Sequence, residues 1–177
     1  MFIPKGRHLL SMKGKVKNAN SSYNTTVEPL DTVMPIVVLV NEATASASEI
    51  TSGTLQDYDR AVIMGTRTYG KGLVQIPNVS LPYNGKLKLT TAKYYIPSGR
   101  CIQALRYKHT DNGYVAENVP DSLTHEFRTA AGRIVRDGGG IKPDIEVKPD
   151  SLPNIAFYLS RVDTTDIMLN YEIDYIA

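Results

Sequence analysis

A strand, a helix and a second strand follow one another between residues 35 and 64, and this succession limits the fold more than any other feature of the sequence. Residues 35–40 are a proline followed by an unbroken aliphatic run, which is typical of a central strand buried on both faces. Residues 44–58 begin with small side chains and continue with apolar ones at helical spacing, which predicts a helix. Residues 61–64 form a second aliphatic run. We therefore expect two parallel strands joined by a right-handed crossover, in the α/β class.

β-hairpins are expected after this unit. Asn84-Gly85 lies between two strand-like segments, 74–79 and 86–96, and favours a turn whose two central residues have positive φ. Further turns are predicted at residues 97–99 and 138–140, which are rich in proline, serine and glycine.

The rest of the chain is less informative. Residues 11–31 are polar, and their pattern fits either a mobile loop or an exposed hairpin. We expect one domain with three parts: a partial N-terminal segment and mobile loop (1–34), a core (35–150) and a C-terminal extension of that core (151–177). The abrupt apolar start of the sequence indicates truncation at the N-terminus.

Composition places the chain among globular proteins and argues against several functions. Apolar residues make up 42% and charged residues 21%, and Lys plus Arg exceed Asp plus Glu by only two. The basic residues are scattered, so we expect no nucleic acid partner. A single cysteine, Cys101, cannot form an intramolecular disulfide, and the three histidines lack the spacing of a metal site. We expect neither a metal nor a cofactor.

Small residues with hydroxyl groups mark the start of the predicted helix, at Thr44-Ala45-Ser46-Ala47-Ser48. A hydroxyl at this position lies beside free N–H groups of the helix, which can hold a developing oxyanion. The arrangement would suit acyl transfer. A serine-rich helix start can equally serve only as a cap, and this segment alone leaves both interpretations open.

The segment Gly65-Thr66-Arg67-Thr68-Tyr69-Gly70-Lys71-Gly72 contains most of a phosphate-binding loop. A functional loop of that kind needs Ser or Thr after the lysine and a helix that starts there. Gly72 occupies the first of these positions, and the residues that follow are strand-like and include a proline. We therefore expect no nucleotide as a ligand.

Lys71 therefore needs a role other than phosphate binding. Its two flanking glycines indicate close packing of the backbone, so we expect the lysine to be buried. A lysine kept away from water can be uncharged and accept a proton, and Ser–Lys pairs use such an amine as the general base in place of histidine. An ordinary surface lysine in a turn is the competing interpretation. The sequence contains no G-x-S-x-G motif that would favour a histidine-based triad.

Taken together, the two segments resemble the carboxyl-terminal processing, or tail-specific, peptidase family. The resemblance is carried by Ser46-Ala47-Ser48-Glu49 and Gly70-Lys71-Gly72-Leu73-Val74-Gln75, and it extends from about residue 35 to residue 147. It implies a crotonase/ClpP-like core. It also implies that Ser46 is the nucleophile, that Lys71 is the base, that Gln75 orients the lysine and that the N–H of Ala47 is an oxyanion donor. Ser48 is the competing nucleophile, but it falls on a different face of the helix.

The family resemblance further implies a serine endopeptidase that cuts unfolded or C-terminally tagged proteins near their C-termini, in the cell envelope or periplasm. It implies a PDZ domain and a second oxyanion donor upstream of this sequence. We therefore expect weak or no turnover from this chain alone. The alternative is a catalytically silent homologue or fragment that binds peptides by strand addition.

Overall fold

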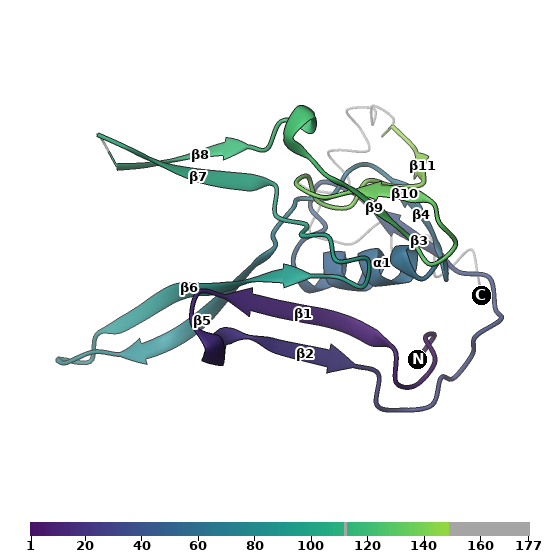
Figure 1. Ribbon diagram of the computed structural model, residues 1–177, viewed down its shortest axis with the longest axis horizontal. Helices are drawn as coiled ribbons and strands as arrows, with labels where there is room; N and C mark the ends of the chain where they lie inside the picture. The colour runs from purple at the N-terminus through teal and green to yellow at the C-terminus, as the bar shows by residue number, and fades with distance from the viewer. Residues whose placement is uncertain (112, 149–177) are drawn as a thin grey trace, which may run out of the picture. The chain divides into compact units, whose positions relative to one another are not determined.

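The computed structural model describes residues 1–111 and 113–148 (Figure 1). Residues Met1–Val147 form one compact unit, and the predicted extension 151–177 lies outside the described residues. The described elements, in chain order, are β1 (His8–Gly14), β2 (Ser21–Asn24), β3 (Val37–Val40), α1 (Ala47–Asp57), β4 (Val62–Gly65), β5 (Leu73–Ser80), β6 (Lys86–Tyr95), β7 (Leu105–Thr110), β8 (Gly113–Asn118), β9 (Glu126–Arg128), β10 (Ile134–Arg136) and β11 (Ile145–Glu146), with 3-10 turns at Lys17–Ala19 and Asp121–Leu123.

The predicted strand, helix and strand are β3, α1 and β4. β3 and β4 are parallel, with Val37 opposite Val62 and Val40 opposite Gly65, and β11 joins the other side of β4. The α/β prediction is confirmed for this unit. The helix begins at Ala47, three residues later than the sequence pattern predicts, because Ser46 has a positive φ that no helix can contain.

The prediction that the strand of residues 35–40 is central and buried on both faces is wrong. The order of the three-stranded sheet is β11-β4-β3, so β4 is central and β3 is at the end. Val40 is buried, whereas Val37 is 56% and Leu39 is 76% exposed. α1 covers one face of the sheet, and no described residue buries Val37 or Leu39 on the other. The aliphatic run gave no sign of this, because its pattern is the same whether one face or both are covered.

The hydrophobic core lies on the covered face of this sheet. Gly53 of α1 allows close packing, since a Cβ there would lie only 2.6 Å from the Cδ1 of Ile141 and 2.8 Å from that of Ile96. Each isoleucine buried in this way stabilises the fold by about 1.5–3 kcal/mol. The buried core residues are Ile3, Val40, Leu55, Ala61, Ile63, Ile96, Ile102 and Ile141.

A four-stranded antiparallel sheet of order β2-β1-β6-β5 lies alongside the helix (Figure 1). The hydroxyl of Tyr58 donates to the carbonyl of His8 at 2.6 Å, and the hydroxyl of Thr54 donates to that of Leu9 at 3.3 Å. α1 is therefore attached to both sheets. The hairpin alternative for residues 11–31 is confirmed, because β1 pairs with β2.

The hairpin predicted at Asn84-Gly85 is formed by β5 and β6, and its turn spans Pro82-Tyr83-Asn84-Gly85. Positive φ values of 59° occur at Tyr83 and Asn84, and the N–H of Gly85 donates to the carbonyl of Pro82. The N–H of Leu81 also donates to the carbonyl of Gly85, which closes the loop outside this turn. Tyr83 and Asn84 are therefore the two central residues and Gly85 is the last residue of the turn, whereas the Asn-Gly signal favours Asn84 and Gly85 as the central pair.

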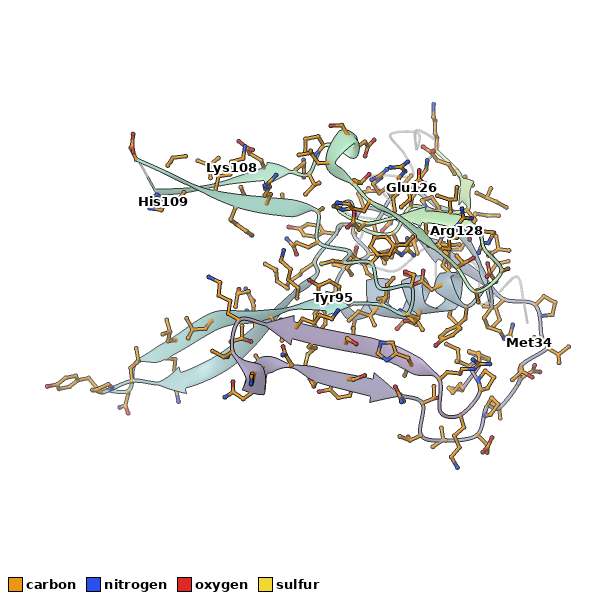
Figure 2. The ribbon with its side chains drawn as sticks, viewed as in Figure 1. Met34, Tyr95, Lys108, His109, Glu126 and Arg128 are labelled. Carbon is orange, nitrogen blue, oxygen red and sulfur yellow. The ribbon has the colours of Figure 1, made fainter. Side chains whose placement is uncertain are left out.

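The remaining strands form two local pairs. β7 and β8 make a hairpin on which Lys108 and Glu117 form an ion pair of 2.5 Å, and Figure 2 shows Lys108 and His109 toward its far end, away from Tyr95. β9 and β10 pair beside the core, where Val135 faces inward. These hairpins add no residue to the predicted site.

Candidate active site

Ser46 lies between β3 and α1 in a conformation that is rare for any residue except glycine. Its φ is 57° and its ψ is −117°. Such values cost about 1–3 kcal/mol and persist only where the surroundings enforce them. The turn before it is fixed by hydrogen bonds from Asn41 N–H to the Thr44 hydroxyl, 3.1 Å, and from Thr44 N–H to the Asn41 carbonyl, 3.0 Å. The fold thus holds a half-buried hydroxyl residue in a strained backbone.

Ala47, the expected oxyanion donor, lies at the N-terminus of α1, and its role stays a prediction. Ala47 is exposed and is the first residue of an eleven-residue helix, so its N–H has no carbonyl one turn earlier in the helix. The Ser46 carbonyl already accepts from Ile50 N–H at 3.0 Å. Ser48 is exposed, unlike Ser46, in keeping with a different helix face.

Glu49 joins the turn that ends at Ser46 (residues 41–46, the serine turn) to the loop between β4 and β5 that carries Lys71 (residues 66–72, the lysine loop). Sequence reasoning missed this role. Its side chain is completely buried and accepts four hydrogen bonds. Oε2 accepts from the N–H groups of Ser46, 2.9 Å, and Lys71, 2.8 Å. Oε1 accepts from the Thr68 hydroxyl, 2.5 Å, and from Gly70 N–H, 2.6 Å. The available signal was the Ser-x-x-Glu spacing of a capping box, which predicts the first of these bonds.

The structure brings the backbones of Ser46 and Lys71 together. Both amides donate to the same oxygen atom of Glu49, so their nitrogens are no further apart than the sum of 2.9 and 2.8 Å. The two segments identified from the sequence therefore meet at one carboxylate.

The expected burial of Lys71 is wrong, because its side chain is exposed. The close packing inferred from its flanking glycines is nevertheless present: a Cβ on Gly70 would overlap that of Ala104, and one on Gly72 would lie 2.6 Å from the nitrogen of Gln103. The glycines let the backbone pack, whereas the lysine side chain between them remains in contact with water.

Gln75 is exposed on β5, where it lies opposite Thr90 of β6. The ladder is irregular between Val74 and Gln75. The predicted contact by which Gln75 orients Lys71 stays a prediction. The structure agrees with the argument against a phosphate-binding loop, because the residues after Lys71 form β5 and not a helix.

A second buried polar cluster lies at the other end of α1. Arg100 is 1% exposed and pairs with Asp57 at 2.9 Å, and it also donates to Gln56 at 2.8 Å. Burial raises the pKa of Asp57, and the Arg100 guanidinium only partly offsets this. Gln56 in turn donates to Asp144 and to the Lys142 carbonyl, both at 2.9 Å. The cluster fastens α1 to distant segments.

A cavity of about 780 Å³ lies beside this cluster, and its lining includes Arg100, Arg133 and Arg136 but neither Ser46 nor Lys71. Each of these guanidinium groups is paired with a carboxylate. We read the cavity as structural. The described residues contain no group of three or more His, Cys, Asp or Glu placed to hold a metal ion. No described helix is long and apolar enough to span a membrane.

Comparison with known proteins gives consistent matches. The profile of peptidase family S41 matches residues 1–110. A carboxy-terminal-processing protease from Bartonella bacilliformis is 45% identical over 169 residues, which is 96% of this chain and 37% of that protein. A chloroplastic C-terminal processing peptidase from Tetradesmus obliquus is 44% identical over 144 residues, covering 81% of this chain and 24% of that protein.

A solved structure agrees with these relatives. The photosystem II D1 C-terminal processing protease superposes with a TM-score of 0.58 at 27% identity, over 86% of this chain and 30% of that one. The chain thus spans 37%, 24% and 30% of the lengths of these three proteins. The match of the family profile to more than half of its residues shows that the chain belongs to peptidase family S41.

Proposed function

We propose that the protein is a serine endopeptidase that hydrolyses peptide bonds near the C-termini of protein substrates, with Ser46 as nucleophile and Lys71 as base. The observation that supports this most directly is the shared Glu49 oxygen, which accepts hydrogen bonds from the backbone N–H groups of both residues. The names of the relatives support the substrate class. A crotonase/ClpP-like core, a PDZ domain and an envelope or periplasmic location remain predictions from the sequence.

In the proposed reaction the Ser46 hydroxyl attacks the scissile carbonyl and its proton passes to the Lys71 amine. The tetrahedral oxyanion is stabilised by the Ala47 N–H at the positive end of α1. Lys71 then protonates the leaving amine, and water attacks the acyl-serine with the same lysine as base. Gln75 orients the lysine. A base must be uncharged to accept the proton, so bound substrate has to remove water from the exposed Lys71 side chain.

The decisive experiment traps the nucleophile. The natural protein that carries this sequence is treated with a phosphonofluoridate, and the modified peptide is identified by mass spectrometry. We expect a single adduct on Ser46, and an adduct on Ser48 instead would contradict the proposal.

Substitutions test the two roles separately. Ser46→Ala and Lys71→Ala should each abolish cleavage of an unfolded protein, whereas Ser48→Ala should lose far less, because its hydroxyl lies on another face of the helix. Full turnover by the Lys71→Ala protein would rule out the mechanism.

A silent, peptide-binding protein is the second candidate, and the exposed Lys71 side chain favours it for the chain as described. The same labelling experiment distinguishes the two. A silent protein would bind an unfolded substrate with measurable affinity but would form no Ser46 adduct.

A further inference from the structure

We propose that Glu49 is a positioning residue that holds Ser46 and Lys71 in register for the reaction, a role that rests on the proposed function. The carboxylate has four donors. Oε2 accepts from one N–H in the serine turn and one in the lysine loop, and Oε1 accepts from two donors in the lysine loop. Glu49 itself does not touch substrate in this scheme.

A capping role alone accounts for only one of the four hydrogen bonds. The capping box requires the bond from Ser46 N–H to the Glu49 carboxylate. The other three donors, Thr68, Gly70 and Lys71, lie 19 to 22 residues further along the chain, in the loop between β4 and β5. A helix start needs none of them, so the carboxylate links two loops that the proposed chemistry has to bring together.

This link is anchored in the core. The Thr68 hydroxyl that donates to Glu49 also accepts from Ile141 N–H at 2.7 Å, and Ile141 is completely buried. Since protein interiors are close-packed, a loop fixed in this way has little freedom to move. The bond from Ser46 N–H at the same carboxylate helps to keep Ser46 in its strained conformation.

Glu49→Gln tests the role with almost no change in shape. A glutamine amide has one acceptor oxygen and one donor nitrogen, so it cannot accept from all four groups. If its oxygen faces Ser46 and Lys71, its nitrogen faces Gly70 N–H; if it is turned over, both Ser46 and Lys71 lose their acceptor. We expect kcat to fall by about a hundredfold, the cost typical of a 1 Å misplacement, with KM little changed.

The exposed carboxylate of Glu42 provides a matched control. It connects the same two loops, accepting from the Thr66 hydroxyl at 3.0 Å, but it is in contact with water. Glu42→Gln should therefore leave kcat close to that of the wild type. A loss of kcat as large as that of Glu49→Gln would show that the exposed bridge matters as much as the buried one and would overturn a specific role for Glu49.

A double-mutant cycle separates positioning from general folding. The rate of adduct formation at Ser46 is measured for Glu49→Gln, Lys71→Ala and the double variant. If Glu49 acts through Lys71, the second substitution should cost less than about threefold in the Lys71→Ala background. Equal losses in both backgrounds, or wild-type kcat in Glu49→Gln, would overturn the inference.

Two results keep this test independent of the proposed function. A Lys71→Ala protein as active as the wild type refutes the Ser–Lys mechanism itself, whereas an inactive Lys71→Ala with an unaffected Glu49→Gln refutes only the role of Glu49. Should Glu49→Gln fail to fold, Thr68→Ser is compared with Thr68→Val: both leave the Oε2 bonds in place, but only valine removes the hydroxyl that donates to Oε1 and accepts from Ile141 N–H. Thr68→Val should lower the rate of adduct formation at Ser46 when Lys71 is present but not in the Lys71→Ala protein, and equal losses in both would again contradict positioning.

Discussion

Ser46 combines the proposed chemistry with an unfavourable backbone conformation, and the two can be separated by substitution. Glycine adopts positive φ freely, whereas alanine does not. We predict that Ser46→Gly and Ser46→Ala are both inactive but that the glycine variant is more stable by about 1 kcal/mol, since relief of strain exceeds the added entropy of the unfolded chain. Urea unfolding of the two variants measures this difference. Equal stability would mean that the serine backbone is not strained.

Asp59 makes folding sensitive to acid. Partial burial alone would raise its pKa, but the Ala131 N–H at 2.6 Å and the Arg133 guanidinium at 2.5 Å hold the pKa of this carboxyl below its usual value. A group with a lowered pKa in the folded state stabilises the fold above its unfolded pKa, and this contribution is lost as the pH falls through the folded value.

Asp59→Asn is therefore predicted to be less stable than the wild type at pH 7, with the difference shrinking below about pH 4 as the wild-type carboxyl is protonated. Thermal unfolding between pH 3 and pH 7 follows the change. A difference that is constant over this range would assign the effect to the shape of the side chain and not to its charge.

At the scale of elements, the lysine loop depends on a glycine. Gly70 has a φ of 84°, and a side chain there would also overlap Ala104. We predict that Gly70→Ala lowers stability by about 1–3 kcal/mol and displaces the loop that carries Lys71. Gly132→Ala is the control, because Gly132 has a similar φ of 86° but open space around it. If both variants lose the same stability, only the backbone conformation matters at residue 70.

The elements that the sequence predicts correctly are those with local signals. Aliphatic runs and helical spacing suffice for β3, α1 and β4, and an asparagine in a turn suffices for the β5–β6 hairpin. The exposure of Leu39 could not be predicted in this way, because an unbroken apolar run has the same pattern whether one or two faces of its sheet are covered.

In the candidate site, too, the features with a local sequence signal were predicted and those that depend on distant residues were not. The spacing of hydroxyl, glycine and lysine residues indicated Ser46 and Lys71, whose backbone N–H groups both donate to Glu49, while their catalytic roles stay predictions. The three bonds from the lysine loop to Glu49 join residues 19 to 22 apart, and no short pattern encodes them. The prediction that Lys71 is buried was wrong, because packing of its backbone does not determine where a long side chain ends.

At the scale of the whole molecule, the Arg100–Asp57 pair joins segments that are 43 residues apart in a fully buried setting. Removal of one partner leaves an uncompensated buried charge, which costs about 3–5 kcal/mol. We predict a loss of this size for Arg100→Met at pH 7. Burial raises the pKa of Asp57, and without the guanidinium the neutral acid is favoured further.

The Arg100→Met defect should therefore become smaller as the pH is lowered and Asp57 gains a proton. Chemical unfolding at pH 5 and pH 7 tests the sign. Asp57→Asn combined with Arg100→Met should be less sensitive to pH than Arg100→Met alone. A defect that grows in acid would show that the aspartate is not the group responsible.

The four donors of Glu49 all lie within 22 residues of it along the chain. The entropy lost when such a short loop closes is modest, and contacts between near neighbours in sequence form early as a chain collapses. The serine turn and the lysine loop can accordingly meet before the distant strands β9, β10 and β11 have been added. The candidate site would then be among the first regions of the protein to acquire its native geometry, and the later strands would be added to a fold in which it is already formed.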